Sequence, residues 1–452
     1  MKQEALPLLA LPDDVLANVL QRCPPGSIAG FPLPLALAQV RLTGSVDPNW
    51  MRPLLHLASK CPAVLRWLSP HLRSIKIGRG GVEVLEATVP QLTRLECLEC
   101  RSRLSPNQLA TLLRLTGLEE LDLGSTVVNM RGISGTLPRL RRLRGRALLE
   151  TDLVHFAPSL QSLAGASIRD VSTMPTSLTR LEVSCFFDSL CPLAHLTGLR
   201  ELVLHSVYPE NLLADLTDLT ALTRLEVHVH TRYSKDGGTP KAWEREQHLL
   251  GVANALKAAP PGLDICLPPD DLSFIETEDG FQAITLLAPH LVDIGGINVT
   301  LDDESDPVPW ATLTRLTRLG ISLYFWDESH WIQPLSQLPS LRDLEVRLEG
   351  SAPDGFGALT QCTRLEVQRV NSATDIAWMR QLTRLQCCRM PGPSFNCLAA
   401  LPDCITQLEL CSGTADQPFS QVTRHLSALE VLAIRWPRDL GQVCDFSELR
   451  RF

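Results

Sequence analysis

The residues whose types and spacing suggest chemistry are cysteines. Cys97-Leu98-Glu99-Cys100 has the two-residue separation of many zinc sites, and Cys387 is followed directly by Cys388. A structural zinc ion needs four converging ligands, and nothing downstream supplies the second pair. On a strand, Cys97 would point outward and Cys100 into the core, because successive side chains alternate between faces. We therefore expect neither pair to bind a metal.

Histidines and glycines offer weaker candidates. His228 and His230 are two apart, so on a strand they share a face and could bind a metal, although surface histidines are far more common. Gly237-Gly238 lies in a polar insertion with no strand before it, which indicates a flexible loop rather than a phosphate-binding loop. Neither a nucleophile elbow nor a metalloprotease helix is present. The sequence thus predicts no catalytic residue, no metal and no cofactor.

The elements that must position any functional side chain are repeated units. In each copy, a leucine, a Thr or Pro, any residue and a second leucine precede two residues, a third leucine, one residue and an aliphatic residue. Residues 115–123 and 196–204 are clear copies. With the third hydrophobic position as the anchor, the anchors are Ile75, Leu98, Leu121, Leu143, Leu163, Leu181, Leu202, Leu225, Ile265, Ile294, Leu319, Leu344, Leu365, Leu385, Leu408 and Leu432.

The spacing of the anchors predicts the fold. Apolar and free positions alternate around each anchor, which is typical of a short strand with one buried face. Parallel strands need a return path; residues 243–258 and 271–287 have helical spacing, and shorter returns have room only for 3-10 helix or extended chain. We expect an α/β solenoid: a curved stack of about sixteen coils with parallel concave strands and a mixed helical, 3-10 and irregular convex side.

This pattern resembles the leucine-rich-repeat family over residues 70–436. The family's usual Asn or Cys, five places beyond the anchor, is replaced by Thr126, Val207, Val370 and Met390. In the family that side chain bonds backbone groups of the loop, so here those groups must find other partners. We divide the chain into an N-terminal segment (1–60), the solenoid (61–436, with long coils around 230–300) and a C-terminal cap or tail (437–452).

Composition limits the classes of partner. The net charge of −8 disfavours a nucleic-acid partner, and the 44% hydrophobic content allows a long core. No apolar run is long enough to cross a bilayer and no signal peptide is apparent, so we expect no membrane partner and a cytoplasmic or nuclear protein. The 14 cysteines are then expected to be reduced, several of them at buried repeat positions such as Cys100, Cys362 and Cys387.

The N-terminal segment does not follow the repeat. Residues 11–25 read as a short helix, with Pro12 suited to its first turn, an apolar stripe, and Pro24-Pro25 ending it. This resembles the start of an F-box, and the resemblance implies docking on the adaptor subunit of a cullin–RING ubiquitin ligase. The matching positions are Leu11, Pro12, Val15, Leu16, Val19 and Leu20. The family's later Val-Cys-x-x-Trp-like stretch has only Val40 and a displaced Trp50, so the F-box is degenerate. The alternative is a helical cap that shields the first coil.

Two columns of side chains should face the concave solvent: the residues just before the anchors (the before column) and just after them (the after column). Much of the before column alternates in sign, which favours a ladder of ion pairs. The after column is mostly acidic, and we expect it to meet a basic segment of a partner, with solvated loops as the alternative. The candidates are Glu182, Glu226, Glu345 and Glu366, with the loop residues Asp302, Asp303 and Glu304. The exception is basic: Arg142, Arg144 and Arg146 share a face and suggest a local anion or phosphate site.

Trp326 and Trp331 belong to the densest aromatic cluster, and interfaces favour such residues; packing between coils is the alternative. The sequence as a whole predicts a non-catalytic protein-recognition module. Its two forms are the substrate receptor of a ubiquitin ligase and a free-standing scaffold whose N-terminus only caps the stack.

Overall fold

A computed structural model of the chain shows two compact units, Met1–Leu204 with Asp218–Leu222, and His205–Thr217 with Thr223–Phe452. We refer to them as unit 1 and unit 2. The structure describes residues 55, 68–77, 88, 91–100, 104–124, 128–129, 135–145, 147–149, 153–168, 174–184, 193–205, 219–228, 242–257, 259–260, 262–267, 278–299, 310–324, 335–349, 356–368, 374–391, 398, 400–411 and 426–435.

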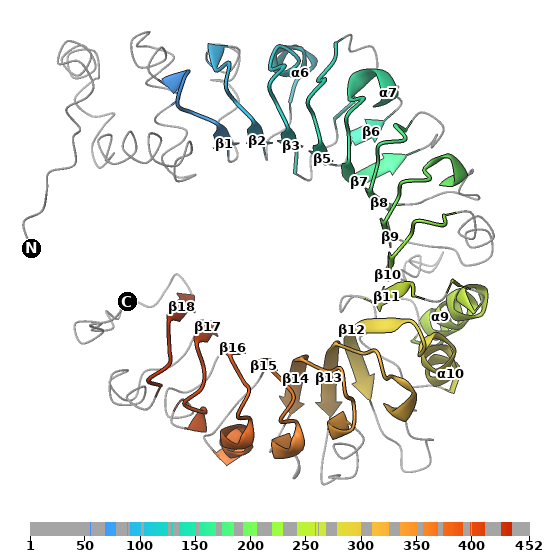
Figure 1. Ribbon diagram of the computed structural model, residues 1–452, viewed down its shortest axis with the longest axis vertical. Coiled ribbons are helices and arrows are strands. Elements are labelled where there is room, and N and C mark those ends of the chain that lie inside the picture. Colours follow the sequence, from blue (N-terminus) through green and yellow to red (C-terminus); the bar gives the residue numbers. More distant parts are fainter. Residues whose placement is uncertain are drawn as a thin grey trace, which may run out of the picture. The chain divides into compact units, whose positions relative to one another are not determined.

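Unit 1 is a stack of parallel strands with short helical returns outside it (Figure 1). The main strands are β1 (Ser74–Ile77), β2 (Cys97–Cys100), β3 (Glu120–Asp122), β5 (Arg142–Arg144), β7 (Ser162–Ile168), β8 (Arg180–Ser184) and β9 (Glu201–His205). The returns include α6 (Pro106–Leu112), α7 (Leu153–Phe156) and the 3-10 turn η5 (Leu193–His195). β4 (Val128–Asn129) and β6 (Ala147–Leu149) form a second small parallel sheet with the end of β7.

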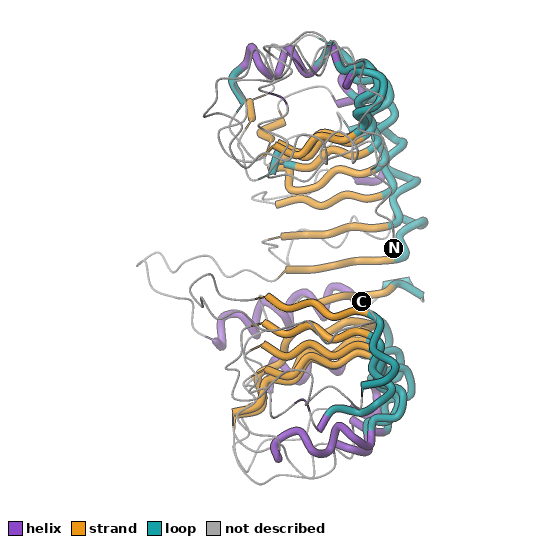
Figure 2. The backbone as a smooth tube through the Cα atoms, turned by 90° about the vertical axis from the view of Figure 1, so that its left-hand side faces the viewer, coloured by secondary structure: helices purple, strands orange, loops and turns teal. Residues whose placement is uncertain are grey.

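Unit 2 repeats the arrangement with longer returns (Figure 1). Its strands are β10 (Arg224–His228), β11 (Asp264–Leu267), β12 (Leu291–Val299), β13 (Arg318–Tyr324), β14 (Asp343–Glu349), β15 (Arg364–Gln368), β16 (Cys387–Pro391), β17 (Gln407–Cys411) and β18 (Val431–Arg435). The returns include the helices α9 (Ala242–Leu256) and α10 (Glu278–Leu287), and the 3-10 segments η7 (Trp310–Thr312), η9 (Phe356–Ala358) and η10 (Thr374–Gln381). In Figure 2 the loops reach the strands of each unit along one edge, as parallel coils require.

These features make the chain an α/β solenoid of the leucine-rich-repeat type, as the sequence predicts. All described strands except β4 and β6 stack as coil strands, close to the expected number of coils. Both expected helices are present within the described residues, α9 close to its expected bounds and α10 from Glu278 onward. α6 was not expected; Pro106 stands in its first turn, and Ser105 and Gln108 form a capping box.

Leucine layers form the core. Leu115, Leu118, Leu121 and Leu123 mark the four apolar positions of one copy, and none of them is more than 3% exposed. Full burial of a leucine side chain contributes about 1.5–3 kcal/mol. Because each coil places its leucines directly on those of its neighbour, the repeat phrase itself fixes the strand register, as in the pair Leu98↔Leu121.

Polar side chains bond backbone carbonyls along the edge where the strands begin. The hydroxyl groups of Thr179, Thr317 and Thr363 each donate to a carbonyl oxygen of the preceding coil, at 3.1, 2.8 and 3.3 Å. Arg315 spans three coils, because it donates to the Leu263 and Pro289 carbonyls, both at 3.3 Å, and pairs with Asp264 at 2.5 Å. Of the four residues that replace the family's Asn, Thr126, Val207 and Val370 lie outside the described residues.

One anchor was assigned wrongly. β16 pairs Leu365 with Cys388, not with Leu385, so Cys388 is the anchor and is buried. Leu385 is the second hydrophobic position of the phrase and Met390 its final apolar one, not a loop position. Cys387 is consequently half-exposed, although we expected it in the core. The free thiols among the described residues include Cys100, Cys266, Cys362 and Cys388, all buried.

Gly145 gives a test of how closely the coils of unit 1 approach one another. Its φ is 149°, and an added Cβ would lie 2.8 Å from the Leu123 Cβ. We expect Gly145→Ala to lower the free energy of unfolding in urea by about 2 kcal/mol. Gly117→Ala is the control, because its Cβ would meet only carbonyl oxygens at 3.4 and 3.6 Å, and it should change stability by less than about 0.5 kcal/mol. Equal losses would contradict the close approach at Gly145.

Candidate functional site

The strand face that bears no coil return carries charged side chains in both units. In unit 1 the before column reads Cys97, Glu120, Arg142, Ser162, Arg180 and Glu201, and the after column reads Glu99, Asp122, Arg144, Ala164, Glu182 and Val203. Most of these side chains are half-buried or exposed; Ala164 and Val203 are buried. The expectation that the two columns face solvent is therefore met where the residues are polar.

Ion pairs join neighbouring strands of unit 1. Lys76 contacts Glu99 at 2.6 Å, Arg142 contacts Glu120, and Arg180 contacts Glu201 at 3.0 Å. Each arginine in these pairs is about half exposed or more, so each pair contributes roughly 0.2–1 kcal/mol at most. The pairs fix the direction of charged groups more than they stabilise the stack.

The same columns line a hollow of about 760 Å³ in unit 1. Its wall changes character from strand to strand. β3 brings Glu120 and Asp122, β5 brings Arg142 and Arg144, and β7 brings only Ser162 and Ala164, both short and neutral. The volume is sufficient for several side chains of a partner, and its polar wall suits charged groups rather than an apolar ligand.

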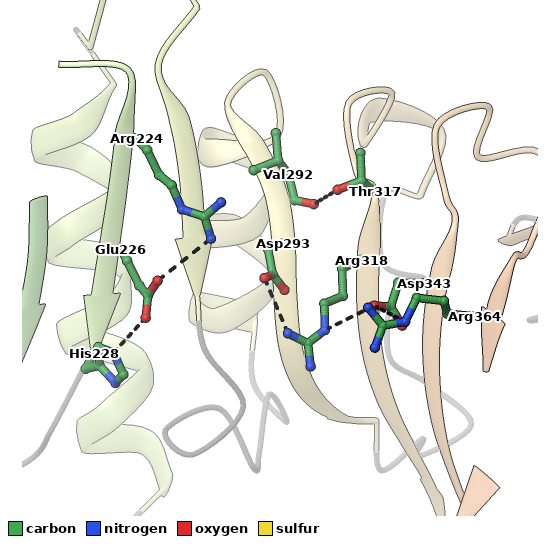
Figure 3. A network of polar contacts seen from close by, with 9 residues as sticks. All are labelled: Arg224, Glu226, His228, Val292, Asp293, Thr317, Arg318, Asp343 and Arg364. Carbon is green, nitrogen blue, oxygen red and sulfur yellow. Dashed lines mark hydrogen bonds and ion pairs between the residues drawn. The ribbon is translucent and has the colours of Figure 1, made fainter. Parts of the chain in front are cut away.

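In unit 2 a row of charged groups crosses the strands (Figure 3). Arg318 lies between Asp293 and Asp343, at 3.8 and 3.9 Å, and Arg364 contacts Asp343 at 3.8 Å. These distances exceed those of hydrogen bonds. The row is a ladder of alternating charge. Its guanidinium and carboxylate groups can still form hydrogen bonds with a partner or with water.

A second group on β10 continues this face. Glu226 lies 3.1 Å from His228 Nε2 and 3.9 Å from Arg224. The partner that we considered for His228, His230, lies outside the described residues. Because Glu226 contacts His228, this pair explains the position of His228 as well as a metal site would. Within the described ranges no cluster of three or more His, Cys, Asp or Glu side chains has the arrangement of a metal site.

Asp293 is the least exposed charged side chain of the row. Burial raises the pKa of its carboxyl above the ordinary 3.8, against the lowering influence of Arg318 and Arg224. Its Oδ1 is buried and has no hydrogen-bond partner among the described groups. Beside it, Cys266 is buried, and burial raises the pKa of that thiol to about 12. A thiol so protonated is a poor nucleophile.

The after column of unit 2 is less uniformly acidic than expected. With Cys388 as the anchor, Arg389 occupies the place given to Gln386, and Arg384 lies before the strand instead of in the before column. Arg389 contacts Glu366 at 3.1 Å and Glu409 at 3.7 Å. Arg389 therefore adds a basic residue to a column that we expected to be mostly acidic. The middle of the column is neutral and buried, at Cys266, Gly295 and Gly320.

The structure describes only some of the predicted contact residues. Glu182, Glu226, Glu345 and Glu366 are all half-buried in the after column, as expected. The loop residues Asp302, Asp303 and Glu304, the aromatic residues Trp326 and Trp331, and the F-box-like positions Leu11 to Leu20 lie outside the described residues. Sequence reasoning missed Arg389, which a strict application of the repeat phrase would have placed in the after column. The order Arg142, Ser162, Arg180 in the before column was predicted correctly.

No protein-family profile matches the chain, and no curated protein matches it. Solved structures do resemble it. An internalin, inlF, from Listeria monocytogenes is 15% identical, with 90% of this chain and 98% of that chain covered and a TM-score of 0.34. A leucine-rich-repeat protein of Leptospira interrogans is 16% identical, covers 82% and 91%, and has a TM-score of 0.33. The plant peptide hormone receptor RGFR1, in complex with RGF2, is 13% identical, covers 81% and 67%, and has a TM-score of 0.28.

The architecture therefore rests on the strand register and the coil returns. Among the helices that the structure describes, none is long and apolar enough to cross a membrane.

Asp293 provides a pH test of the unit 2 ladder. Because its folded pKa is raised, the ionised form weakens the fold, and stability falls as pH rises from about 3.8 through the folded pKa. Asp293→Asn should then be more stable than the natural protein at pH 7 and lose this advantage at a pH below 3.8. Urea unfolding at the two pH values measures the difference. Asp403→Asn, on an exposed turn, is the control; an equal gain there would contradict the prediction.

Proposed function

We propose that this chain is a non-catalytic protein-recognition module. The observation that carries the proposal is the polarity of the uncovered strand face in each unit. Long rows of arginine, aspartate and glutamate side chains lie there at the fixed spacing of neighbouring strands, about 4.8 Å. Such a surface offers many weak, separately placed charges, which suit recognition of an extended or folded protein surface.

The finer proposal for the partner is a basic segment that meets the acidic residues of the after column. On β14 and β15, Glu345 and Glu366 stand directly opposite each other in register. Like charges at such positions disfavour one another. Arg389 already contacts Glu366 at 3.1 Å, and a cation from a partner would relieve the repulsion further. Glu226 in unit 2 and Glu182 in unit 1 are further acidic residues of the after column, and Asp302, Asp303 and Glu304 belong to the same proposal.

A labelled octalysine peptide tests this surface directly by fluorescence anisotropy. Glu345→Gln should weaken binding about threefold, because one attractive charge is lost. Asp403→Asn removes the same charge from an exposed turn away from the column and should leave binding unchanged. Equal effects of the two variants would show that the peptide senses only net charge, and the basic-segment proposal would fail.

The finer proposal for the N-terminal segment is adaptor docking. In this form the protein is the substrate receptor of a cullin–RING ubiquitin ligase and works in the cytoplasm or nucleus. Leu11, Pro12, Val15, Leu16, Val19 and Leu20 then bind the adaptor subunit, and the solenoid selects the target. The support is the resemblance of this segment to the start of an F-box, together with the order of the segment and the repeats.

Co-purification with the ligase adaptor tests this form. The natural chain should retain the adaptor, and the double variant Leu11→Ala with Leu16→Ala should lose it, because two apolar anchors of a small interface are removed. The control replaces Val154 and Val431, which are 43% and 50% exposed in the solenoid, with alanine. Absent retention, or retention indifferent to Leu11 and Leu16, would leave a free-standing scaffold whose N-terminal helix is a cap.

A further inference from the structure

In unit 1 the alternation of charge is interrupted at one strand. The register places Ser162 on β7 between Arg142 on β5 and Arg180 on β8. On their outer sides these arginines contact Glu120 and Glu201. The before column therefore reads acid, base, serine, base, acid. The position over Ser162 is where a negative charge would complete the sequence.

Both arginines keep donors for a further anion. Each contact to Glu120 or Glu201 involves one terminal nitrogen of the guanidinium group, whereas a guanidinium has five N–H donors. The side chains of Arg142 and Arg180 are 67% and 48% exposed. A carboxylate or phosphoryl group between them would accept charge-assisted hydrogen bonds from two sides, and such bonds are stronger than those between neutral groups.

A third arginine adds to the positive charge beside β7. Arg144 is exposed, follows the anchor of β5, and lies next to Ala164 in register. Among the described residues it has no ion pair, and its neighbour Asp122 instead accepts a hydrogen bond from the Gly124 amide at 2.7 Å. On the far side of Ala164, Glu182 opposes an anion. Three arginines therefore lie around this point. The carboxylate next to Ala164 in register is that of Glu182, and Glu120, Asp122 and Glu201 also line the hollow.

The space over β7 is available. Ser162 and Ala164 line the hollow of about 760 Å³, together with the three arginines. Both are shorter than every charged residue on the flanking strands. A strand bulge at Gly165, whose φ is 75°, follows directly and shifts the register between Ala164 and Ala166. The two short side chains thus lie between strands that bear the arginines.

We infer that unit 1 binds an anionic side chain of a protein partner over Ser162, through Arg142, Arg144 and Arg180. The group is a carboxylate or a phosphoserine, which share the oxygen geometry that guanidinium groups recognise. The inference rests on the proposed role in protein recognition and adds a second kind of contact, distinct from the acidic residues proposed to meet a basic segment.

The test uses the full chain and labelled heptapeptides of glycine and serine whose central residue is phosphoserine, glutamate or glutamine. Anisotropy at low salt should rank the peptides phosphoserine, then glutamate, then glutamine, since the phosphoryl group carries more charge. A glutamate peptide that binds as well as the phosphoserine peptide would assign the site to carboxylates. Arg144→Gln should weaken binding of the charged peptides about tenfold. Equal binding of all three peptides would overturn the inference.

Ser162→Glu is the sharpest variant. Its carboxylate would occupy the position between Arg142 and Arg180, so peptide binding should be lost and the melting temperature should exceed that of Ser162→Gln, a control of equal size. Glu182→Gln should act in the opposite direction and tighten binding about threefold, because the carboxylate next to Ala164 is neutralised. Undiminished binding by Ser162→Glu, or weaker binding by Glu182→Gln, would also overturn the inference.

The outcome is separable from the proposed function. Octalysine and adaptor binding do not involve Ser162, so their failure would reject the basic-segment and ligase proposals while the peptide result stands. Conversely, failure of the charged heptapeptides alone would remove only the anion site. Circular dichroism of each variant shows whether it is folded, and Arg144→Gln tests the inference if Ser162→Glu is not.

Discussion

Everything in this molecule depends on parallel strands stacked in register at a fixed spacing. Leucine layers impose that register, because each anchor lies on the anchor of the next coil. Once the register is set, the outward side chains of neighbouring strands mainly meet their neighbours in the same column. The ion pairs Arg142–Glu120 and Arg318–Asp343 follow from this constraint. Function, in turn, depends on which charges the columns leave available.

The repeat could be predicted from the sequence because burial is periodic. Most anchors were placed correctly, as the pairs Leu225↔Ile265 and Ile294↔Leu319 show. Between these two long coils the register shifts, and Ile294 pairs with Leu267 instead of the assigned anchor Ile265. The error at β16 arose where cysteine stands at the anchor: the phrase Leu382, Leu385, Cys388, Met390 was shifted by one position, because Leu385 is more hydrophobic than Cys388. A core position is defined by its place in the phrase, and cysteine fills it as a small apolar side chain.

The candidate site was less predictable. The alternation of residue types predicts which side chains face outward. The charges that stand side by side in a column depend on the strand register, which the alternation does not give. Between β11 and β12 the register shifts, so Cys266 lies opposite Asp293, and a column read by sequence position alone passes from the after series into the before series there. The burial of Asp293 is associated with this register shift, which the local sequence pattern does not predict.

Arg315 has a consequence for how the solenoid opens. In a linear stack, each coil contacts only its neighbours, and local unfolding can begin at any weak junction. Arg315 bonds groups contributed by the coils of β11 and β12 while standing in the turn that precedes β13. Its side chain links three successive coils, so that unfolding of one coil breaks contacts made by the other two. Amide hydrogens of β11, β12 and β13 should then exchange with solvent as one cooperative unit.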